Sequence, residues 1–382
     1  MPRSLHRHKI LVVFGTRPEA IKLAPVVQAL RAQSKRFIPR VCITAQHREM
    51  LDQVISIFHI GVHHDLNIMQ RGQSLEDITG RVLQGMKVVL EKERPDMMVV
   101  QGDTTTTFAA ALAAYYANVP IAHVEAGLRT WQKRSPFPEE INRVLTTHLA
   151  DLHFPPTAQS GKNLLREGVS RKRVIVTGNT VIDALFHVRA AIRPQYASYE
   201  RKFKEIDFGK KMILVTGHRR ENFGSGFLDI CKAIRSIAER EPEVEIVYPV
   251  HLNPNVQKPV REILSGHKNV HLLEPQEYRP FVFLMDRSYL ILTDSGGVQE
   301  EAPSLGKPVL VMRNHTERPE AVNAGTVRLV GTNQQKIVRE VMTLLHNPAV
   351  YRKMSRAHNP YGDGKSSGRV VRWIGRYLEE KR

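Results

Sequence analysis

The sequence predicts an α/β fold made of two doubly wound domains. Short apolar runs rich in Val, Ile and Met recur along the chain, and each ends in a small or polar loop that a helical pattern follows. This alternation is typical of a parallel sheet covered by helices on both faces. The rhythm starts again in the second half, and a chain of 382 residues is long for one core but suits two domains.

In the first half, the predicted strands cover residues 8–15, 40–46, 95–102 and 119–127. Helical patterns follow the first three of them, over residues 16–33, 47–58 and 103–118. The third helical pattern contains four consecutive threonines, residues 104–107, whose β-branched side chains favour a strand. We interpret them as the first turn of a helix, because threonine hydroxyls can bond the exposed backbone groups there.

In the second half, the predicted strands cover residues 210–217, 244–251, 269–275, 288–294, 307–313 and 326–332. A helix is expected over Ser225–Glu241, and another begins at Gly297. A third follows the last of these strands and ends at about Leu345, and a fourth covers Val370–Leu378 after a Pro/Gly loop at 359–368. A charged, weakly periodic stretch at 193–209 indicates a nearby domain join. We therefore expect a first domain over residues 1–180 and a second over 181–365, with a C-terminal helix at about 366–382 that could pack back on the first.

The composition is that of an ordinary globular protein, with 42% hydrophobic and 25% charged residues. The only two cysteines, Cys42 and Cys231, provide neither a disulfide framework nor a zinc pattern, so we expect a reducing, cytoplasmic location. No apolar run approaches the roughly 20 residues of a membrane span. The basic N-terminal segment precedes an apolar run that is too short for a signal peptide.

The formal net charge is +18, which suits anionic ligands such as nucleic acids or a phosphorylated small molecule. The basic residues are dispersed along the chain, however, and aromatic residues make up only 7%. No known nucleic-acid-binding module is visible. A nucleic-acid-binding protein therefore remains a remote alternative.

Polar clusters follow five predicted strands at their carboxyl ends, at residues 15–19, 102–103, 125–127, 217–221 and 294–297. One such cluster is ordinarily a helix cap or a turn, but five on two sheets indicate more than capping. In open α/β sheets, ligands bind beyond the carboxyl ends of the strands. We therefore expect a ligand site in a cleft between two domains that face each other.

Three carboxylates in these loops could exchange protons, although each also has a structural interpretation. Asp103 could be the N-cap of the following helix, since Asp is favoured there. Glu125 could form a surface salt bridge. Glu139 opens a predicted helix, where a carboxylate complements the helix dipole.

The second half offers groups suited to an anion. The small residues of DSGG allow the backbone to approach a phosphate at a helix start, and Glu301 could bind a ribose diol. Arg17 and Arg318 lie in predicted loops and suit phosphate oxygens. His218 is flanked by arginines, whose charge should favour the neutral imidazole.

The segments FGTRPEAIKLAP, TAQHREMLDQV, GDTTTT, HVEAGLRT, PEEINR, TGNTVIDAL, TGHRREN, YPVHLNPNV, TDSGGVQEEAPSLGKPVL, TERPEAV and NPYGDG, in this order, resemble the non-hydrolysing UDP-N-acetylglucosamine 2-epimerases. The resemblance covers nearly the whole chain. It implies a glycosyltransferase-B-like architecture, with two Rossmann-type domains and an active site in their cleft. It also implies reversible C2 epimerisation of UDP-N-acetylglucosamine to UDP-N-acetylmannosamine by anti elimination of UDP and re-addition, without metal or cofactor, for bacterial surface polysaccharide synthesis.

The resemblance also implies roles for individual residues. Those expected to be catalytic, in contact with the sugar or the diphosphate, are Asp103, Glu125, Glu139 and His218. Those expected to bind the nucleotide are Arg17, Lys22, Gln276, Phe281, Ser295, Gly297, Glu301 and Arg318. Which carboxylate acts on which face of C2 stays open.

Some positions depart from the family's common pattern. Gln101 stands where His is frequent, Phe137 where Trp or Tyr is frequent, and Asn314 with His315 where Asp-Thr is frequent. The Gln101 difference bears on the level of activity and leaves the type of reaction unchanged. Relatives are commonly homodimers, and some bind a second UDP-N-acetylglucosamine as an activator, which Gln46 and the loop 70–73 could border. A hydrolysing 2-epimerase and a UDP-sugar glycosyltransferase of the same fold are the alternatives.

Overall fold

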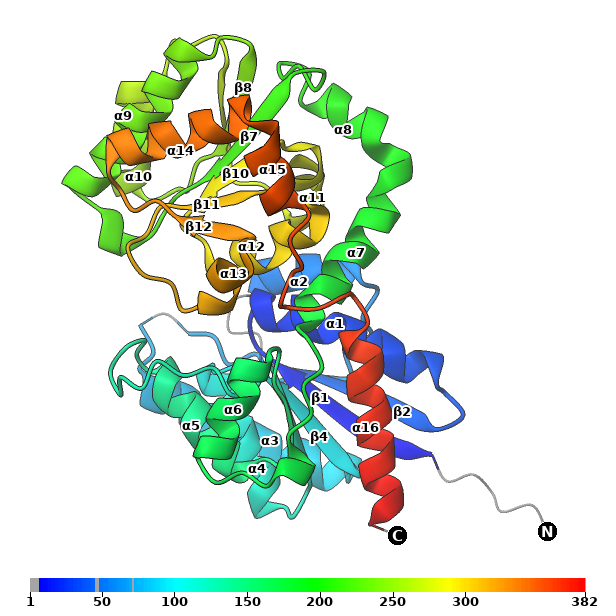
Figure 1. The fold of residues 1–382 in the computed structure, drawn as a ribbon. Helices are drawn as coiled ribbons and strands as arrows, with labels where there is room; N and C mark the ends of the chain where they lie inside the picture. The colour runs from blue at the N-terminus through cyan, green and yellow to red at the C-terminus, as the bar shows by residue number, and fades with distance from the viewer. Residues whose placement is uncertain (1–6, 45–47, 71, 382) are drawn as a thin grey trace. The chain divides into compact units, whose positions relative to one another are not determined.

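The computed structural model describes residues 7–44, 48–70 and 72–381, and the side chains of residues 48–50 are outside the description. The chain divides into two compact units. The first contains Met1–Ala184 and Tyr361–Arg382, and the second contains Leu185–Pro360. Each unit is an α/β layer structure with one central sheet (Figure 1).

The first unit is built on a six-stranded sheet of order β3-β2-β1-β4-β5-β6. Its strands are β1 (His8–Phe14), β2 (Phe37–Ile43), β3 (His64–Asp65), β4 (Met97–Gln101), β5 (Ile121–Val124) and β6 (Leu152–Phe154). All pairs of neighbouring strands are parallel. The predicted strand over 40–46 begins earlier, at Phe37, and the two short edge strands β3 and β6 were not predicted.

The helices of the first unit are α1 (Arg17–Ala32), α2 (Arg48–Ile57), α3 (Leu75–Glu93), α4 (Thr105–Tyr116), α5 (Glu139–Leu149), α6 (Ala158–Arg166), η1 (Arg171–Arg173) and, at the C-terminus, α16 (Ser366–Glu380). Helix α16 returns to this unit and packs on α1. Asp183 holds its first turn by accepting bonds from the backbone of Ser366 and Ser367. Helix α7 (Thr180–Ile192) spans the residues where one unit passes into the other.

The second unit repeats the same topology in a sheet of order β12-β11-β10-β7-β8-β9. Its strands are β7 (Lys211–Thr216), β8 (Val244–Pro249), β9 (Val270–Leu273), β10 (Leu290–Thr293), β11 (Val309–Val311) and β12 (Val327–Leu329). Its helices are η2 (Arg193–Gln195), α8 (Tyr196–Lys202), η3 (Arg220–Asn222), α9 (Ser225–Arg240), α10 (Pro254–Leu264), α11 (Tyr278–Arg287), α12 (Gly296–Glu301), η4 (Ala302–Leu305), α13 (Pro319–Ala324), α14 (Gln334–His346) and α15 (Pro348–Ser355). The prediction of two doubly wound, Rossmann-like α/β sheets is thus confirmed.

The strand order of each sheet fixes where its ligand loops lie. In the first sheet the order reverses between β1 and β4, and in the second between β7 and β10. Loops that leave the carboxyl ends of such a central pair diverge to opposite faces, which opens a crevice at this topological switch point. The segments GTRPE and GD follow β1 and β4, while GHRRE and DSGG follow β7 and β10.

Each sheet is held by an apolar core of its own. In the first unit, Val13, Met98 and Val100 pack with Val82 and Ala110 of the covering helices α3 and α4, and all are buried. A second core in the other unit joins its strands to α9, α10 and α14. Burial of such side chains contributes about 1.5–3 kcal/mol each, so both sheets are rigid supports for the loops at their edges.

None of the helices in the described part of the chain has the length and the apolarity needed to cross a bilayer.

Candidate active site

The GTRPE and GDTTTT loops are joined by one buried carboxylate. Glu19 is 2% exposed and closes a capping box with Thr16 at the start of α1. Its Oε2 accepts bonds from the backbone N–H of Gly15 at 3.1 Å and of Thr16 at 2.8 Å. Its Oε1 accepts bonds from the hydroxyls of Thr104 at 2.7 Å and Thr107 at 3.0 Å. The threonine run is therefore the first turn of α4, as predicted, and it also clamps the two loops together.

Asp103 lies between β4 and α4, and it is not the N-cap of the helix. The N-cap is Thr104, whose hydroxyl accepts the backbone N–H of Thr107 at 3.1 Å. The Asp103 side chain instead forms an ion pair with Arg143, with Oδ2 and Nη2 2.7 Å apart. Asn142 also donates to the Asp103 carbonyl at 3.0 Å. Because two residues of α5 hold Asp103, its carboxylate is fixed and 27% exposed.

Glu125 follows β5 in a strained conformation. Its φ of +60° lies in the left-handed region, which non-glycine residues rarely adopt outside functional or tightly held sites. The carboxylate lies 2.6 Å from the Lys22 ammonium and accepts a bond from the Asn179 amide at 3.1 Å. Lys22, expected to contact the nucleotide, thus has an ion pair with a predicted catalytic carboxylate.

Glu139 and Glu140 begin α5, as predicted, but they serve different purposes. Glu140 is 3% exposed and accepts the backbone N–H groups of Thr130 and Trp131 at 3.0–3.1 Å, so it holds the preceding loop. Glu139 is partly exposed, and its carboxylate has no hydrogen bond or ion pair to any residue that the structure describes. Since residues four apart lie on the same helix face, Glu139 lies one turn from Arg143, the partner of Asp103.

A buried histidine, His123, contacts the backbone of the Gly102–Asp103 turn. The Nε2 atom of His123 lies 2.7 Å from the carbonyl of Gly102, whose φ of +73° favours glycine. Burial lowers the pKa of His123 to about 4, against the opposing effect of that hydrogen bond. His123 is therefore a neutral donor that positions the turn.

In the second unit, His218 follows β7 and lines a cavity of about 420 Å³ together with Arg219, Arg220, Glu221, His251 and Asn253. The rings of His218 and His251 stack at 5.3 Å between centroids. Burial lowers the pKa of His218; Asp294 opposes this shift, and His251 and Arg219 add to it. The pKa of His218 is thus shifted downward, toward the neutral imidazole that the sequence predicted. Burial is the main cause of this shift, and the neighbouring arginine is a lesser one.

The DSGG segment begins the six-residue helix α12, with Ser295 as its N-cap. A Cβ atom on Gly296 would come within 2.6 Å of the Arg318 guanidinium, so this glycine makes room for the arginine. Arg318 is anchored by Glu300, with Nε and Oε1 2.6 Å apart. A Cβ atom on Gly297 would meet nothing nearer than a Glu301 oxygen at 3.8 Å.

Three more predicted nucleotide contacts, Glu301, Gln276 and Phe281, belong to the second unit. Glu301 is 7% exposed and accepts a bond from the Tyr278 hydroxyl at 2.6 Å. Gln276 donates to the carbonyl of Glu274 at 2.7 Å. Phe281 is only half-buried on α11, whereas Phe283 on the same helix is fully buried among Tyr196, Tyr199, Phe203 and Phe208. The aromatic core therefore depends on Phe283, and Phe281 keeps an accessible edge.

Two further predictions concern the first unit. Arg17 opens α1, and its side chain has no hydrogen bond or ion pair within the described residues. Gln101, which departs from the family pattern, is 3% exposed, and its carbonyl accepts a bond from the Thr107 hydroxyl at 2.6 Å. Gln46 and one residue of the loop 70–73, Arg71, which were expected to border an activator site, lie outside the described residues.

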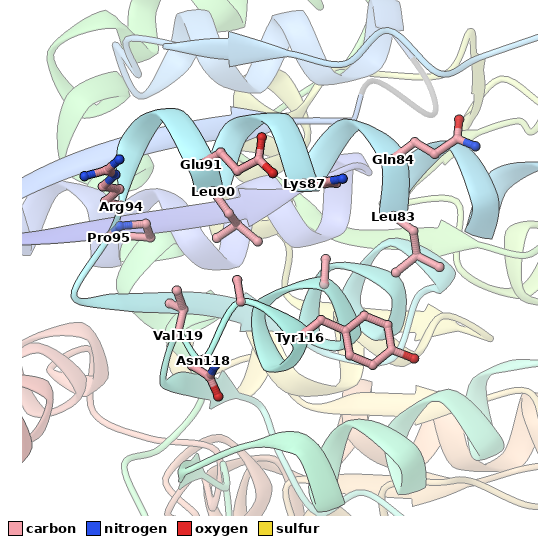
Figure 2. A pocket seen from close by; sticks show the side chains of 12 residues that line it. Leu83, Gln84, Lys87, Leu90, Glu91, Arg94, Pro95, Tyr116, Asn118 and Val119 are labelled. Atoms are coloured by element: carbon pink, nitrogen blue, oxygen red, sulfur yellow. The ribbon is translucent and has the colours of Figure 1, made fainter.

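A large apolar pocket lies away from these loops. It has a volume of about 800 Å³ and is lined by α3, α4 and the turns that follow them. Figure 2 shows Leu83, Leu90, Tyr116 and Val119 among its lining residues. None of the predicted site residues lines it. Among the described residues, no group of three or more His, Cys, Asp or Glu side chains is placed to hold a metal ion.

The predicted site residues thus fall into one cluster per unit. The first contains Arg17, Lys22, Asp103, Glu125 and Glu139, and the second contains His218, Gln276, Phe281, Ser295, Gly297, Glu301 and Arg318. Sequence reasoning missed four residues that hold them: Glu19, Arg143, Asn179 and Asp294. All four lie inside motifs noted above, but their partners are distant in sequence, so motif spacing alone did not indicate their roles.

Fold and site together define a class of protein: an α/β enzyme with two Rossmann-like units, one presenting carboxylates and the other a histidine with arginines. A family model described as UDP-N-acetylglucosamine 2-epimerase matches residues 28–375. The chain belongs to the UDP-N-acetylglucosamine 2-epimerase family.

Individual relatives agree with that assignment. The chain is 60% identical to the UDP-N-acetylglucosamine 2-epimerase of Yersinia pestis over 95% of its own length and 97% of the relative. It is 60% identical to the enzyme of that name from Escherichia coli (strain K12), with the same coverage. The crystal structure of UDP-GlcNAc 2-epimerase from Neisseria meningitidis bound to UDP-GlcNAc is 53% identical, has a TM-score of 0.89, and covers 96% of this chain and 99% of that one.

Proposed function

We propose that the protein interconverts UDP-N-acetylglucosamine and UDP-N-acetylmannosamine by inverting C2 of the sugar. The observation that carries the proposal is the pair of carboxylates after β4 and β5, each fixed by a cation: Asp103 by Arg143 and Glu125 by Lys22. Carboxylates held in place in this way suit repeated proton removal and return. Membership of the 2-epimerase family supports the choice of substrate.

The chemistry requires both kinds of group that the chain presents. The C2 proton lies beside the anomeric carbon and not beside a carbonyl, so it is poorly acidic. In the proposed route a base removes this proton, the bond between C1 and the diphosphate oxygen breaks, and 2-acetamidoglucal and UDP result. An acid then returns a proton to the other face of C2 while the UDP oxygen bonds C1 again. The two half-reactions balance, so no metal, oxidant or cofactor is required.

In this proposal the first unit performs proton transfer. Asp103, Glu125 and Glu139 are the acid/base candidates, and they differ in their surroundings. Two of them are ion-paired, whereas Glu139 has no partner among the described residues. Such a difference allows one group to act as base while another acts as acid. The assignment of each to one face of C2 requires the deuterium experiment below with single variants.

The second unit supplies the nucleotide contacts in this proposal. His218 and Arg318 stabilise the departing diphosphate, because charge-assisted bonds are strong and cations act where negative charge develops. Ser295, Gly297 and Glu301 contact the diphosphate and ribose, and Phe281 contacts the uracil. Gln276 completes this set, together with Arg17 and Lys22 of the first unit.

Further properties follow from the resemblance and are proposed with it. We propose a cytoplasmic homodimer that supplies UDP-N-acetylmannosamine for bacterial surface polysaccharide, with binding of a second UDP-N-acetylglucosamine as an activator. Light scattering tests the dimer. A sigmoidal dependence of the reverse rate on added UDP-N-acetylglucosamine tests the activator.

The decisive experiment is NMR of UDP-N-acetylglucosamine with the purified protein in deuterated water. The expected result is the manno epimer carrying deuterium at C2, at equilibrium with the gluco epimer and with little free UDP. Stoichiometric UDP with free N-acetylmannosamine would indicate a hydrolysing epimerase, and sugar transfer only after an acceptor is added would indicate a glycosyltransferase. Steep salt-dependent binding to nucleic acid without any response to UDP would point to the remote alternative.

A further inference from the structure

Asp294, which no motif singled out as a site residue, is the carboxylate around which the His218 loop is built. It follows β10 directly and is 0% exposed. Its Oδ2 accepts the backbone N–H groups of His218 and Arg219, both at 2.8 Å. The Asn222 amide approaches the same oxygen at 3.4 Å. One oxygen of the carboxylate is thus used to hold the loop.

The other oxygen faces the imidazole. Asp294 Oδ1 is buried without a hydrogen bond to any described residue, and the Nδ1 atom of His218 lies 3.4 Å from it. That distance is slightly longer than an N–H···O bond. A buried carboxylate oxygen without a donor is costly and therefore needs an explanation. The His218 ring is that explanation, since a shift of a few tenths of an ångström would complete a bond from Nδ1–H.

The opposite side of the imidazole is open to a ligand. The His218 side chain is 40% exposed and lines the cavity shared with Arg219, Arg220 and His251. Among the described residues, none forms a hydrogen bond to its Nε2 atom. With Nδ1 directed to Asp294, Nε2 is the atom left for an anion in the cavity.

We infer that Asp294 is the positioning residue of His218: it fixes the imidazole with its proton on Nδ1 and stabilises the imidazolium that forms when a diphosphate binds. A carboxylate in this position selects the tautomer and supports the charged form, as in other carboxylate–histidine pairs. The imidazolium takes its second proton from solvent and donates Nε2–H to the diphosphate oxygen that leaves C1. The identity of the substrate in this inference rests on the proposed function, whereas the contacts between Asp294 and the His218 loop do not depend on it.

The groups that face the imidazole define the pH dependence. Asp294 lies at the end of β10, His251 stacks from the loop after β8, and Arg219 lies in the same loop as His218. Arg220 and Glu221 line the cavity beyond, and Glu221 is bound to Arg313 at 2.5 Å. Asp294 is the only one of these that raises the pKa of His218, so its removal should lower that pKa further.

The test combines ¹⁵N NMR of the histidine rings with steady-state kinetics on the full chain. The His218 signal is assigned by its loss in His218→Gln. In the wild type at a pH where the ring is neutral, the Nδ1–H tautomer is expected, and the Nε2–H tautomer would overturn the inference without any need for a variant at Asp294. In Asp294→Asn, which retains one oxygen for the two backbone bonds, we expect the His218 pKa to fall.

We also expect kcat of Asp294→Asn to fall about 10- to 100-fold, less than the 10²- to 10⁴-fold ascribed to a full acid/base group. The alkaline limb of the dependence of kcat on pH should move to lower pH in this variant. Glu245→Gln is the matched control, because it removes the carboxylate of another His–Glu pair in the same unit, with His271. It should leave the His218 signals unchanged. An unaltered His218 tautomer and pKa in folded Asp294→Asn would reduce Asp294 to a structural residue. If the wild type forms no epimer, the proposed function fails, while the NMR titration still decides the inference.

Discussion

The loops after β1 and β7 occupy equivalent places in two sheets of the same topology, and both read Gly-x-Arg-x-Glu: GTRPE at 15–19 and GHRRE at 217–221. Each loop is held by a buried carboxylate that accepts two consecutive backbone N–H groups. In the first unit this carboxylate is the loop's own glutamate, Glu19. In the second it is Asp294, which directly follows the neighbouring strand β10.

The difference changes which carboxylates are left for chemistry. In the second unit Glu221 binds Arg313, while Asp294 holds the loop with Oδ2 and faces the buried side of the His218 ring with Oδ1. In the first unit Glu19 does the holding, so Asp103, the acidic residue after β4, is available to Arg143 and to solvent. The topology determines where the loops lie, and the source of one carboxylate determines what each can do. Function therefore depends on the loops more than on the fold.

The first prediction tests whether Asp103 takes part in proton transfer, unlike the carboxylates that hold the loops. Asp103→Asn should retain the fold and lose turnover by about 10²- to 10⁴-fold, because an amide cannot exchange the proton. Asp96→Asn is the control: Asp96 precedes β4 as Asp103 follows it, and the two side chains are 34% and 27% exposed. Epimer formation measured by NMR for both variants decides. Near-normal turnover in Asp103→Asn would leave the residue as a partner of Arg143 and nothing more.

The second prediction contrasts the acid stability of the two units. Burial lowers the pKa of His123 to about 4 and of His153 to about 3, and both lie in the first unit. The unfolded chain binds protons at its ordinary pKa of about 6.5, so the stability from these neutral rings is present above that pH and is lost as the pH falls toward 4 and 3. At pH 5 the loss is about 2 kcal/mol for each histidine.

Hydrogen exchange measured separately for the two units at pH 7.5 and pH 5 checks this expectation. The first unit should lose more protection than the second after correction for intrinsic rates. His123→Gln, which does not titrate and can still donate to the Gly102 carbonyl, should flatten the dependence. Equal loss in both units, or an unchanged slope in that variant, would contradict the assignment to buried histidines.

Many of the strands and loops of the two units could be predicted from the sequence. Strands such as β1 (His8–Phe14) and β4 (Met97–Gln101) were predictable, because continuous apolar runs are typical of a buried parallel sheet. The edge strands β3 and β6 have the sequences HD and LHF, so they leave no Val- or Ile-rich run to detect, unlike the equally short β11, which reads VLV. The positions of the loops that carry the candidate site residues were predictable too, because polar residues follow those strands directly.

The partners within the loops were not predictable in the same way. The clamp between Glu19 and Thr104 spans 85 residues, and the bond from Asp294 to the His218 loop spans 76. Local pattern rules see only a few residues around a position, so they proposed Asp103 as a helix cap where Thr104 has that role. Which carboxylate holds a loop and which is left exposed depends on tertiary contact.

The third prediction concerns binding in the second unit. Glu301→Ala should raise KM about 10-fold while kcat changes little, because ribose contacts are similar in the ground and transition states. Tyr278→Phe removes the hydroxyl that donates to Glu301 but leaves the carboxylate, so its KM should rise less. Initial rates over a range of UDP-N-acetylglucosamine concentrations separate the two constants. A loss confined to kcat would place Glu301 in the chemical step.

The fourth and smallest prediction tests the Glu19 clamp through two neighbouring threonines. Thr107 donates to both Glu19 and the Gln101 carbonyl, at 3.0 Å and 2.6 Å. Thr107→Val preserves shape but leaves these buried acceptors short of a donor, so the free energy of unfolding should fall by about 1–2 kcal/mol. The hydroxyl of Thr105, which is 8% exposed, makes no hydrogen bond within the described part of the chain. Thr105→Val should therefore change stability by only a few tenths of that amount.

Thermal and urea unfolding of the two variants, measured side by side, isolate the hydroxyl from the shape of the residue. Both substitutions place the same side chain in the first turn of α4, so helix propensity cancels in the comparison. A lower kcat in Thr107→Val than in Thr105→Val would show that the clamp also positions Asp103, which lies two residues before α4 begins. Equal stabilities would mean that the Thr107 hydroxyl adds nothing to the clamp and that α4 is held to Glu19 through the Thr104 hydroxyl alone.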